Sequence, residues 1–506
     1  MPQVNRFVLV LVLDGLRPDA ITREDTPTLF RLREEGVSFA DSHAVFPTVT
    51  RVNATAITTG TQPGTNGIVG NAMYVPAVDD RRAFDTAAFQ NLLRLDQLTG
   101  GRMVMAPTLG ERLHAHGRRL AAVSSGSTGS ALLLNPRAPG GVGVLVNGWF
   151  DPGMLVAWPQ DVNRAILERF GPAPKKGGTT DRLDGCVDWT QDVLCEYVLP
   201  ELKPDVVVNW VTEPDHIQHG LGSGAPAMRA ALANDDRQVA RLLERLESLG
   251  LIGRTNLFVV SDHGFGWNAG TVNLARELVT AGLKADPPSD DVVIASNGQS
   301  AALHVKHRDR RRIEAIVQFL FSRDWVGVVF TAGRGSGQPL GWVDGTFALE
   351  LIHLANAERG PDVVVTFPWT SGQNPYGVSG TDVCLTDGAS GGPPRLAADH
   401  GSMSPWNVRN TLLAWGVDVK SGVTVSTPAG NVDVVPTILA LLGLPDGERM
   451  DGRVLTEALV GGPDHEQVAV SRQVHTTGVE RLGYSAALQI SEVAGQRYVD
   501  KSWRVR

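Results

Sequence analysis

The chain is 506 residues long, and its 42% of hydrophobic and 20% of charged residues are ordinary values for globular proteins, which excludes a disordered, collagen-like or coiled-coil chain. Its 46 Lys and Arg against 54 Asp and Glu give a net charge of −8, which argues against binding of a nucleic acid polymer through surface charge. The three cysteines, Cys186, Cys195 and Cys384, are too few and too scattered for a disulfide framework or a cysteine-only zinc site.

The first apolar run, residues 7–13, ends directly at Asp14 with no small-residue cleavage site after it. A secretion signal needs a longer apolar core, and a membrane span needs about 20 apolar residues. We therefore expect a cytoplasmic protein that does not enter a membrane. A monomer and a homodimer are both compatible with the sequence.

Short apolar runs rich in Val and Leu alternate along the chain with segments that have the pattern of helices. The strand candidates are residues 7–13, 120–123, 206–211, 257–260 and 363–367, and the helix candidates are residues 27–35, 225–249, 272–281 and 311–321. Runs that are apolar throughout are typical of strands buried on both faces. The alternation predicts a doubly wound α/β fold, in which functional side chains gather at the carboxyl ends of parallel strands.

Three stretches have the composition of loops or insertions rather than of core, because they are rich in Gly: residues 140–176, 331–345 and 371–394. Residues 301–394 contain strand and helix patterns of their own, which predicts a smaller inserted α/β subdomain near the active site. The catalytic core then comprises residues 1–300 and 395–460. Residues 461–506 are expected to form a C-terminal extension packed on this core.

Asp and His residues follow the strand candidates at the points where an α/β enzyme carries its functional groups. In chain order they are Asp14, Asp215, His219, Asp262, His263 and His400. Taken singly, each has an ordinary explanation as a helix cap or a turn residue, although Asp215 and His219 are four apart and so can share one helix face. Together they form a set of nitrogen and oxygen ligands of the kind that zinc or manganese favours.

A second cluster lies at residues 46–60, which read FPTVTRVNATAITTG, and is followed by TQPGTNGIVGN, which ends at Asn71. Pro47 can end the preceding extended segment, so we predict a helix from about Thr50 to Thr59. In the structural interpretation, the Thr50 hydroxyl caps this helix. In the functional interpretation, the free N–H groups and the dipole at the helix start favour an ionised hydroxyl and a bound phosphate there.

The ordered motifs LDG, FPTVTRVN, GIVGN, PDHIQH, DHG and DHGS, which carry Thr50, Asn71 and all six Asp and His candidates, resemble the alkaline phosphatase superfamily. Within it the chain looks most like the type I phosphodiesterase and nucleotide pyrophosphatase branch. The resemblance covers about residues 7–453 and includes a tail in which Asp433, Asp451 and Arg453 are expected to be structural. It implies an alkaline phosphatase-like fold with a mostly parallel central sheet and helices on both faces, in agreement with the strand pattern.

The resemblance also implies a bimetallic hydrolase of small-molecule phosphodiester or pyrophosphate bonds, nucleotides among them, with two Zn²⁺ ions or alternatively Mn²⁺. Carried over position by position, one metal would be held by Asp215, His219 and His400, and the other by Asp14, Asp262, His263 and the Thr50 oxygen. Thr50 would attack phosphorus to form a covalent phosphothreonine, and Asn71 would donate its amide to a non-bridging oxygen.

The nucleophile segment departs from that branch, whose members usually continue the threonine as T-F-P-N-H, with an aromatic residue for the nucleotide pocket. Here Arg51 follows Thr50, and it could bind a phosphate or carboxylate oxygen of the substrate, point to solvent or pair with an acid. Other aromatic residues could replace the missing ring or simply pack in the core: Tyr74, Phe265, Trp267 and Trp406. Our candidates for contacts to substrate are Asn71, Arg51, Tyr74 and Phe265.

Two other functions stay open. A phosphonoacetate or other phosphonate hydrolase would combine the same threonine nucleophile with the same ligand series. Sulfatases are excluded because they need a C/S-x-P-x-R motif, which the segment TRVN lacks. The alternative that is not an enzyme is a catalytically inactive metal-binding scaffold of the same fold. The sequence argues against it, because every expected metal ligand and the expected nucleophile are present.

Overall fold

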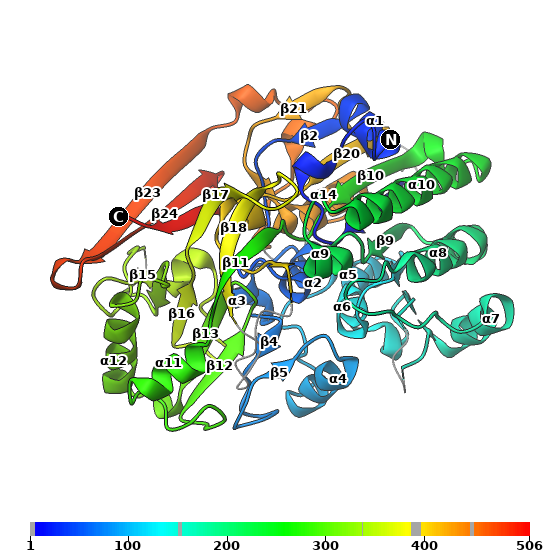
Figure 1. Ribbon diagram of the computed structural model, residues 1–506. Helices are drawn as coiled ribbons and strands as arrows, with labels where there is room; N and C mark the ends of the chain where they lie inside the picture. Colours follow the sequence, from blue (N-terminus) through cyan, green and yellow to red (C-terminus); the bar gives the residue numbers. More distant parts are fainter. Residues whose placement is uncertain (1–5, 150–153, 336, 386–395, 446–449, 506) are drawn as a thin grey trace.

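The computed structural model describes residues 6–149, 154–335, 337–385, 396–445 and 450–505 (Figure 1). Its largest sheet has nine strands in the order β21-β2-β20-β10-β1-β9-β6-β7-β8. The bounds are β1 Phe7–Leu13, β2 Val37–Phe39, β6 Leu120–Ser124, β7 Val144–Asn147, β8 Ala157–Trp158, β9 Val206–Val211, β10 Thr255–Val260, β20 Leu412–Gly416 and β21 Val423–Val425. Neighbours from β10 to β7 pair in parallel, whereas β20 and β8 pair antiparallel. The predicted mostly parallel central sheet is confirmed.

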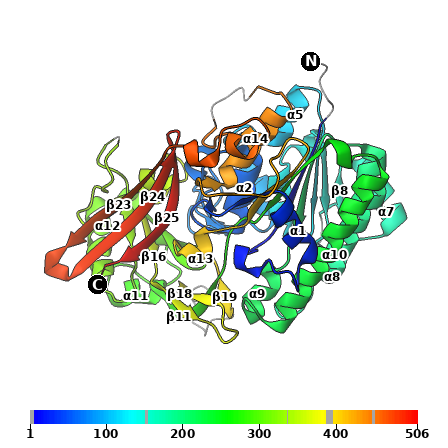
Figure 2. The ribbon, with the colours of Figure 1, turned by 90° about the horizontal axis from the view of Figure 1, so that it is seen from above.

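The sequence of β1, FVLVLVL, shows why helices cover both faces of this sheet. All seven residues are buried, and successive side chains of a strand point to opposite faces. Val8, Val10 and Val12 join a core with residues of α2, α6 and α14, while Phe7 and Leu9 join a second core with residues of α1, α7, α8 and α10. Figure 2 shows α7, α8 and α10 on one side of the sheet and α2 and α14 on the other.

The helices end close to the limits that the sequence predicted. Their bounds are α1 Pro27–Glu35, α2 Thr50–Thr59, α3 Pro63–Asn66, α4 Phe89–Leu98, α5 Leu109–Ala115, α6 Thr128–Leu134, α7 Gln160–Phe170, α8 Asp184–Val193, α9 Asp215–Leu221, α10 Pro226–Ser248, α11 Leu274–Thr280, α12 Arg310–Phe321, α13 Pro405–Val408 and α14 Val434–Leu441. The predicted helices at 27–35 and at Thr50 to Thr59 match α1 and α2 exactly at both ends.

Two further sheets lie beside the carboxyl ends of the central strands (Figure 1). A five-stranded sheet has the order β12-β13-β16-β14-β15, with β12 Val292–Ser296, β13 Ser300–Val305, β14 Val329–Thr331, β15 Phe347–Ala348 and β16 Val363–Thr366. A four-stranded sheet has the order β17-β18-β11-β19, with β11 Gly266–Val272, β17 Trp369–Gln373, β18 Ser379–Leu385 and β19 Ala398–Asp399. Short pairs β3 Ser42–His43 with β22 Ala429–Gly430, and β4 Ala72–Met73 with β5 Phe84–Asp85, complete this region.

The run at 363–367 is β16, a strand of the five-stranded sheet, and it lies within residues 301–394, which the sequence assigned to a separate subdomain. One expectation about the chain needs correction. The stretch at 140–176 is not an insertion, because β7 and β8 within it form the end of the central sheet and α7 packs in one of its cores. Gly and Pro around these short strands concealed them. The predicted loop at 371–394 includes β18, and its residues 386–394 lie outside the described residues.

The C-terminal residues form an antiparallel sheet of β23 Val470–Val479, β24 Tyr484–Val493 and β25 Gln496–Arg504. The Ser502 N–H on β25 donates to the Met403 carbonyl (3.1 Å), which attaches the sheet to the loop beside α13. On β24, the ring of Tyr484 stacks on Phe321 of α12 with centroids 4.1 Å apart. The sheet therefore contacts both the central and the five-stranded sheet regions. Across the described ranges, every helix falls short of the length and apolar character that a membrane crossing requires.

Candidate active site

The predicted metal ligands come together because three neighbouring central strands end at the same edge. Asp14 directly follows β1, Asp215 begins α9 after β9, and Asp262 follows β10 by two residues. These strands are adjacent and parallel, in the order β10-β1-β9, so their carboxyl ends meet. His219 lies one helical turn after Asp215, and His400 follows β19 of the four-stranded sheet. We call Asp14, Asp215, His219, Asp262, His263 and His400 the ligand cluster.

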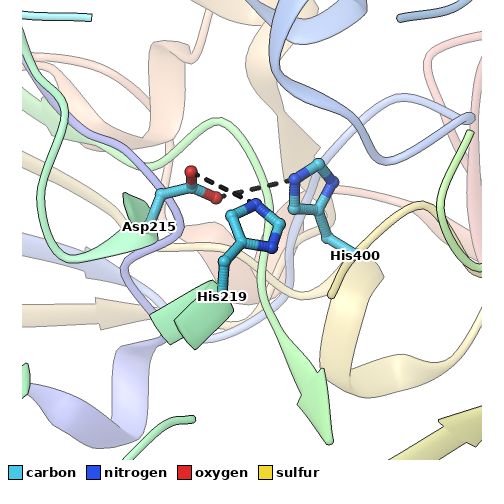
Figure 3. A group of neighbouring side chains, drawn as sticks. All are labelled: Asp215, His219 and His400. Carbon is cyan, nitrogen blue, oxygen red and sulfur yellow. Dashed lines mark ion pairs between the residues drawn. The ribbon is translucent and has the colours of Figure 1, made fainter. Parts of the chain in front are cut away.

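One half of the ligand cluster is formed by Asp215, His219 and His400, which Figure 3 shows facing one another. His219 Nε2 lies 3.5 Å from Asp215 Oδ2, and His400 Nε2 lies 3.5 Å from Asp215 Oδ1. The spacing of four residues places Asp215 and His219 on one face of α9, as predicted. These three side chains offer one ligand atom each within 4.8 Å of one another and so form a candidate metal site.

The other half is formed around His263. Its Nε2 lies 3.0 Å from Asp262 Oδ2, 3.6 Å from Asp14 Oδ1 and 3.3 Å from Thr50 Oγ1. Asp14, Asp215 and His263 form a second candidate metal group with ligand atoms within 4.8 Å. Asp215 thus belongs to both groups, so its carboxylate lies between the two candidate sites.

The backbone fixes the orientation of all three imidazoles. Nδ1 of His219 hydrogen-bonds the Ala398 carbonyl (3.1 Å), Nδ1 of His263 that of Gly264 (2.9 Å), and Nδ1 of His400 that of Thr48 (3.1 Å). A carbonyl only accepts, so each Nδ1 carries the proton. Each Nε2 therefore faces the aspartate oxygens and is the ring atom left to bind a metal once it has given up its proton.

Each carboxylate of the ligand cluster has one oxygen without the hydrogen bond that a buried acid normally accepts. Asp14 Oδ1, Asp215 Oδ1 and Asp262 Oδ2 are buried and accept no hydrogen bond from any described residue. Burial, together with the charges of Asp262 and Asp215, raises the pKa of Asp14 well above its ordinary value. Burial lowers the pKa of His219, but the charge of Asp215 and a hydrogen bond to it raise this pKa to about 9. Divalent cations would neutralise this acidic cluster and replace that proton, so the donor set fits a metal centre.

The candidate nucleophile is the first residue of α2. Val49 occupies the cap position, and within the described chain no side chain caps this helix, so Thr50 does not act as the cap. Its hydroxyl instead points to His263. Asn71 Oδ1 accepts the Arg51 N–H (3.1 Å), and the Asn71 N–H donates to Asn297 Oδ1 (2.8 Å). The structure thus brings Thr50 and Asn71 together at the helix start beside the ligand cluster.

The proposed substrate contacts differ in their surroundings. Phe265 is fully buried, and its ring packs edge-on against the imidazoles of His219 (5.0 Å) and His400 (5.5 Å). Tyr74 is half-buried, its hydroxyl donates to the Asp80 carbonyl (3.1 Å) and its ring lies 5.0 Å from that of His304. Arg51 faces Asp85, with 3.6 Å between Nη2 and Oδ1.

Sequence reasoning missed the side chains that hold the ligand loops in place. The Trp210 indole N–H on β9 donates to Asp14 Oδ2 (3.1 Å). The Asn431 amide donates both to the Asp262 carbonyl (2.8 Å) and to Asn53 Oδ1 on α2 (2.9 Å), which ties α2 to the loop that carries Asp262. The indole N–H of Trp210, in a mostly apolar strand, was the available signal for the first contact, whereas the sequence around Asn431 gives no signal for the second.

Comparison with known proteins agrees with this geometry. The type I phosphodiesterase/nucleotide pyrophosphatase family matches residues 8–366, which is more than half of the chain. The chain belongs to this family. Its resemblance to phosphodiesterases, inferred from the motifs, is thereby confirmed.

Curated relatives of this family member match over half of the chain. Venom phosphodiesterase of Naja atra is 24% identical over 260 residues, which is 51% of this chain and 26% of the relative. An uncharacterized pyrophosphatase/phosphodiesterase of Schizosaccharomyces pombe is 23% identical over 270 residues, 51% of this chain and 44% of the relative. The matches therefore span less than half of these relatives.

Among solved structures, murine ectonucleotide pyrophosphatase/phosphodiesterase 5, an inactive threonine-to-alanine variant in complex with AMP, has a TM-score of 0.61 and 17% identity. The alignment covers 90% of this chain and 100% of that one. It establishes that the family member described here has the fold of these pyrophosphatases.

Proposed function

We propose that this family member is a zinc-dependent hydrolase of small-molecule phosphodiester or pyrophosphate bonds that acts through a covalent phosphothreonine on Thr50. The observation that carries the proposal is the position of the Thr50 hydroxyl, at the open start of α2 and 3.3 Å from His263 Nε2 within the ligand cluster. The ionised form of a hydroxyl at this position would be stabilised by cations bound in the ligand cluster and by the dipole of α2.

We assign Asp215, His219 and His400 to one Zn²⁺, and Asp14, Asp262, His263 and Thr50 to the other, with Asp215 between the two. When bound, the two ions supply charge for the attacking and leaving oxygens of an in-line displacement. Mn²⁺ suits the same nitrogen and oxygen donors.

In the first step, Thr50 Oγ1 forms a bond to phosphorus, the ester bond to the leaving group breaks, and the leaving oxygen takes up a proton. Asn71 donates its amide N–H to a non-bridging oxygen, where negative charge develops. In the second step, water attacks phosphorus and releases Thr50 with its proton restored. Phe265 keeps the imidazoles of His219 and His400 in place, and Tyr74 lines the approach next to Asn71.

Nucleotides are the substrates that the relatives suggest, because the structural neighbour was solved with AMP. A phosphonate substrate such as phosphonoacetate is the second candidate, favoured by Arg51 at the position after the nucleophile. The third possibility is a metal-binding scaffold that does not catalyse hydrolysis. One experiment can therefore distinguish a nucleotide or diester hydrolase, a phosphonate hydrolase and an inactive scaffold.

The decisive experiment assays zinc-loaded wild type and Thr50→Ala against bis-p-nitrophenyl phosphate, a dinucleotide pyrophosphate and phosphonoacetate, with the bound metal counted in parallel. We expect about two zinc ions in both proteins and hydrolysis of the first two substrates by wild type alone. Hydrolysis of phosphonoacetate alone would replace the proposed substrate class. Two bound zinc ions without any hydrolysis above the Thr50→Ala control would favour the scaffold.

A further inference from the structure

Arg51 is a mostly buried arginine that lacks the partners such a side chain requires. Its side chain is 15% exposed, and its contact with Asp85 is a loose ion pair of 3.6 Å between Nη2 and Oδ1. Arg51 Nε is fully buried and donates to no acceptor in the part of the chain that the structure describes. A guanidinium has five N–H donors, and a buried donor without an acceptor lowers the stability of the folded protein.

Other buried arginines in the same molecule show the usual solution. Arg17 donates two hydrogen bonds to Asp19 and two to backbone carbonyls. Arg359 donates three hydrogen bonds, all to backbone carbonyls. Arg17 has an acceptor at each side-chain nitrogen, and Arg359 leaves only its Nε unpaired. Arg51 has an unpaired Nε and, at its terminal nitrogens, one loose ion pair, so a further partner of Arg51 is expected to come from outside the chain.

The position of Arg51 indicates where that partner lies. Arg51 is the second residue of α2, directly after Thr50, and its own backbone N–H holds Asn71. The Arg51 side chain therefore begins one residue from the proposed nucleophile and beside the residue proposed to hold a phosphoryl oxygen. An anionic group next to the scissile phosphorus is the partner that this position suggests.

The present partner of Arg51 is well suited to release it. The Asp85 side chain is 65% exposed, and its Oδ1 already accepts the Ala87 N–H (2.8 Å). Asp85 belongs to the β4–β5 hairpin that begins directly after Asn71. An exposed ion pair of this length contributes little, so an incoming oxyanion with good bidentate geometry would outcompete Asp85.

We propose that Arg51 binds a second anionic group of the substrate, a phosphate, phosphonate or carboxylate close to the scissile phosphorus, and that Asp85 holds the guanidinium until that group arrives. This inference rests on the proposed function and specifies its substrate class. It makes Arg51 the residue that selects doubly anionic substrates over diesters without a second charge.

The test measures binding in the absence of turnover, on zinc-loaded Thr50→Ala protein, by calorimetry with three probes. Methylphosphonate has no second anionic group, phosphonoacetate adds a carboxylate, and methylenediphosphonate adds a phosphonate. For each protein, the affinity for each doubly anionic probe is divided by the affinity for methylphosphonate. This ratio is compared between Thr50→Ala protein and the same protein carrying Arg51→Met, Arg51→Lys or Asp85→Asn. Because the ratio is compared between variants, chelation of free zinc by a probe cancels.

We expect Arg51→Met to lower the ratio about tenfold to a hundredfold for at least one of the doubly anionic probes, because a charge-assisted bidentate bond is lost. Whichever probe responds identifies carboxylate or phosphonate as the preferred group. Arg51→Lys should keep part of the ratio. Asp85→Asn keeps the bond from the Ala87 N–H, removes the competing charge, and should raise the ratio slightly.

An unchanged ratio in Arg51→Met, with methylphosphonate still bound, would overturn the inference. So would a loss in Asp85→Asn as large as that in Arg51→Met, because Arg51 would then be a structural partner of Asp85. Different results would refute the proposed function: wild type that binds no zinc, or hydrolysis that persists at the wild-type rate in Thr50→Ala. The melting temperature of each metal-free variant establishes that it is folded.

Discussion

Two buried clusters of charged side chains in this protein contain similar residues but differ in how their polar atoms are paired. In the ligand cluster, oxygens of Asp14, Asp215 and Asp262 accept no hydrogen bond from the described residues. The second cluster, which we call the C-terminal junction, joins the β23–β25 sheet to the core through His43, Asp41, Asp500, Asp433, Tyr498, Arg453 and Glu457. None of its side-chain atoms is a buried atom without a partner among the described residues.

The charged side chains of the C-terminal junction form hydrogen bonds or ion pairs with one another or with the backbone. His43 Nδ1 bonds the Ala429 carbonyl (2.9 Å) and its Nε2 bonds Asp500 Oδ1 (2.9 Å). Arg453 forms a two-pronged ion pair with Glu457 (2.6 and 2.9 Å). Opposite charges that satisfy one another need no ligand. Carboxylates held close together, each with one buried oxygen that accepts no hydrogen bond, leave room for a cation, and this difference distinguishes the ligand cluster from the C-terminal junction.

The largest expected effect comes from one charge in the ligand cluster. Asp14→Asn preserves an acceptor for the Trp210 indole but removes the charge of a proposed metal ligand. We expect hydrolysis to fall about a thousandfold or more, while the melting temperature of the metal-free protein stays equal or rises because repulsion among the carboxylates is relieved. Added zinc should stabilise wild type more than this variant.

The matched control for that change is Asp500→Asn in the C-terminal junction. The same chemical substitution should lower the melting temperature and leave the rate of hydrolysis by the folded protein unchanged. If the two variants behaved alike in both measurements, the distinction between the clusters would be wrong.

A smaller effect, on stability alone, is expected from Glu457→Ala. Glu457 is fully buried, and its removal leaves the Arg453 guanidinium, itself mostly buried, without its carboxylate. Breaking such a pair costs about 3–5 kcal/mol of unfolding free energy, which urea denaturation would measure. The kcat/KM of the folded variant should equal that of wild type; a parallel loss of activity would show that the junction also supports the active site.

The C-terminal junction should also respond to pH in a defined direction. Burial lowers the pKa of His43, but the hydrogen bond to Asp500 and the charges of Asp41 and Asp500 outweigh it and raise this pKa. Burial raises the pKa of Asp500, but the contacts with His43 outweigh it and lower that pKa. The ring of Tyr498 also packs on His43 (5.5 Å).

Stabilisation by the His43–Asp500 pair is therefore fully present between about pH 4 and pH 6.5, the ordinary pKa values of Asp and His. It should decline as pH rises through the raised pKa of folded His43, and as pH falls through the lowered pKa of Asp500. The difference in melting temperature between wild type and His43→Gln, measured across pH, should narrow above pH 6.5. A difference that widens there would contradict the sign.

The smallest effect is expected at the protein surface. Arg102 and Glu358 form a two-pronged ion pair with both side chains about half exposed (51% and 52%). Solvent screens such a pair, so Arg102→Gln should leave the melting temperature and hydrolysis at wild-type values. A loss comparable to that of Glu457→Ala would mean that burial does not govern the strength of these pairs.

The ligand cluster could be predicted from the sequence because its logic is local. Asp14, Asp215 and Asp262 follow strands of the central sheet, and parallel strands bring their carboxyl ends to one edge of a sheet. His400 follows β19 of another sheet, and the family resemblance rather than a strand candidate grouped it with the others. The start of α2 at Thr50 was readable from Pro47. Positions that depend on one strand or one helix were therefore predicted well.

What the sequence did not reveal depends on distant partners. The sequence did not show which strands β16 pairs with, since an apolar run carries no record of its neighbours, and β7 was hidden by the Gly and Pro around it. The unsatisfied state of Arg51 depends on Asp85, which is 34 residues away, and on the packing of a hairpin. Such features arise only when the chain is folded, and they are the ones that point to substrate.

The central claim is that Thr50 carries the phosphoryl group between two steps of hydrolysis. Zinc-loaded wild type is mixed with bis-p-nitrophenyl phosphate, quenched in acid during turnover and analysed by peptide mass spectrometry. We predict a p-nitrophenyl phosphoryl group on Thr50, absent from Thr50→Ala and from unreacted protein. Hydrolysis by Thr50→Ala at the wild-type rate, or a modified residue other than Thr50, would contradict the account.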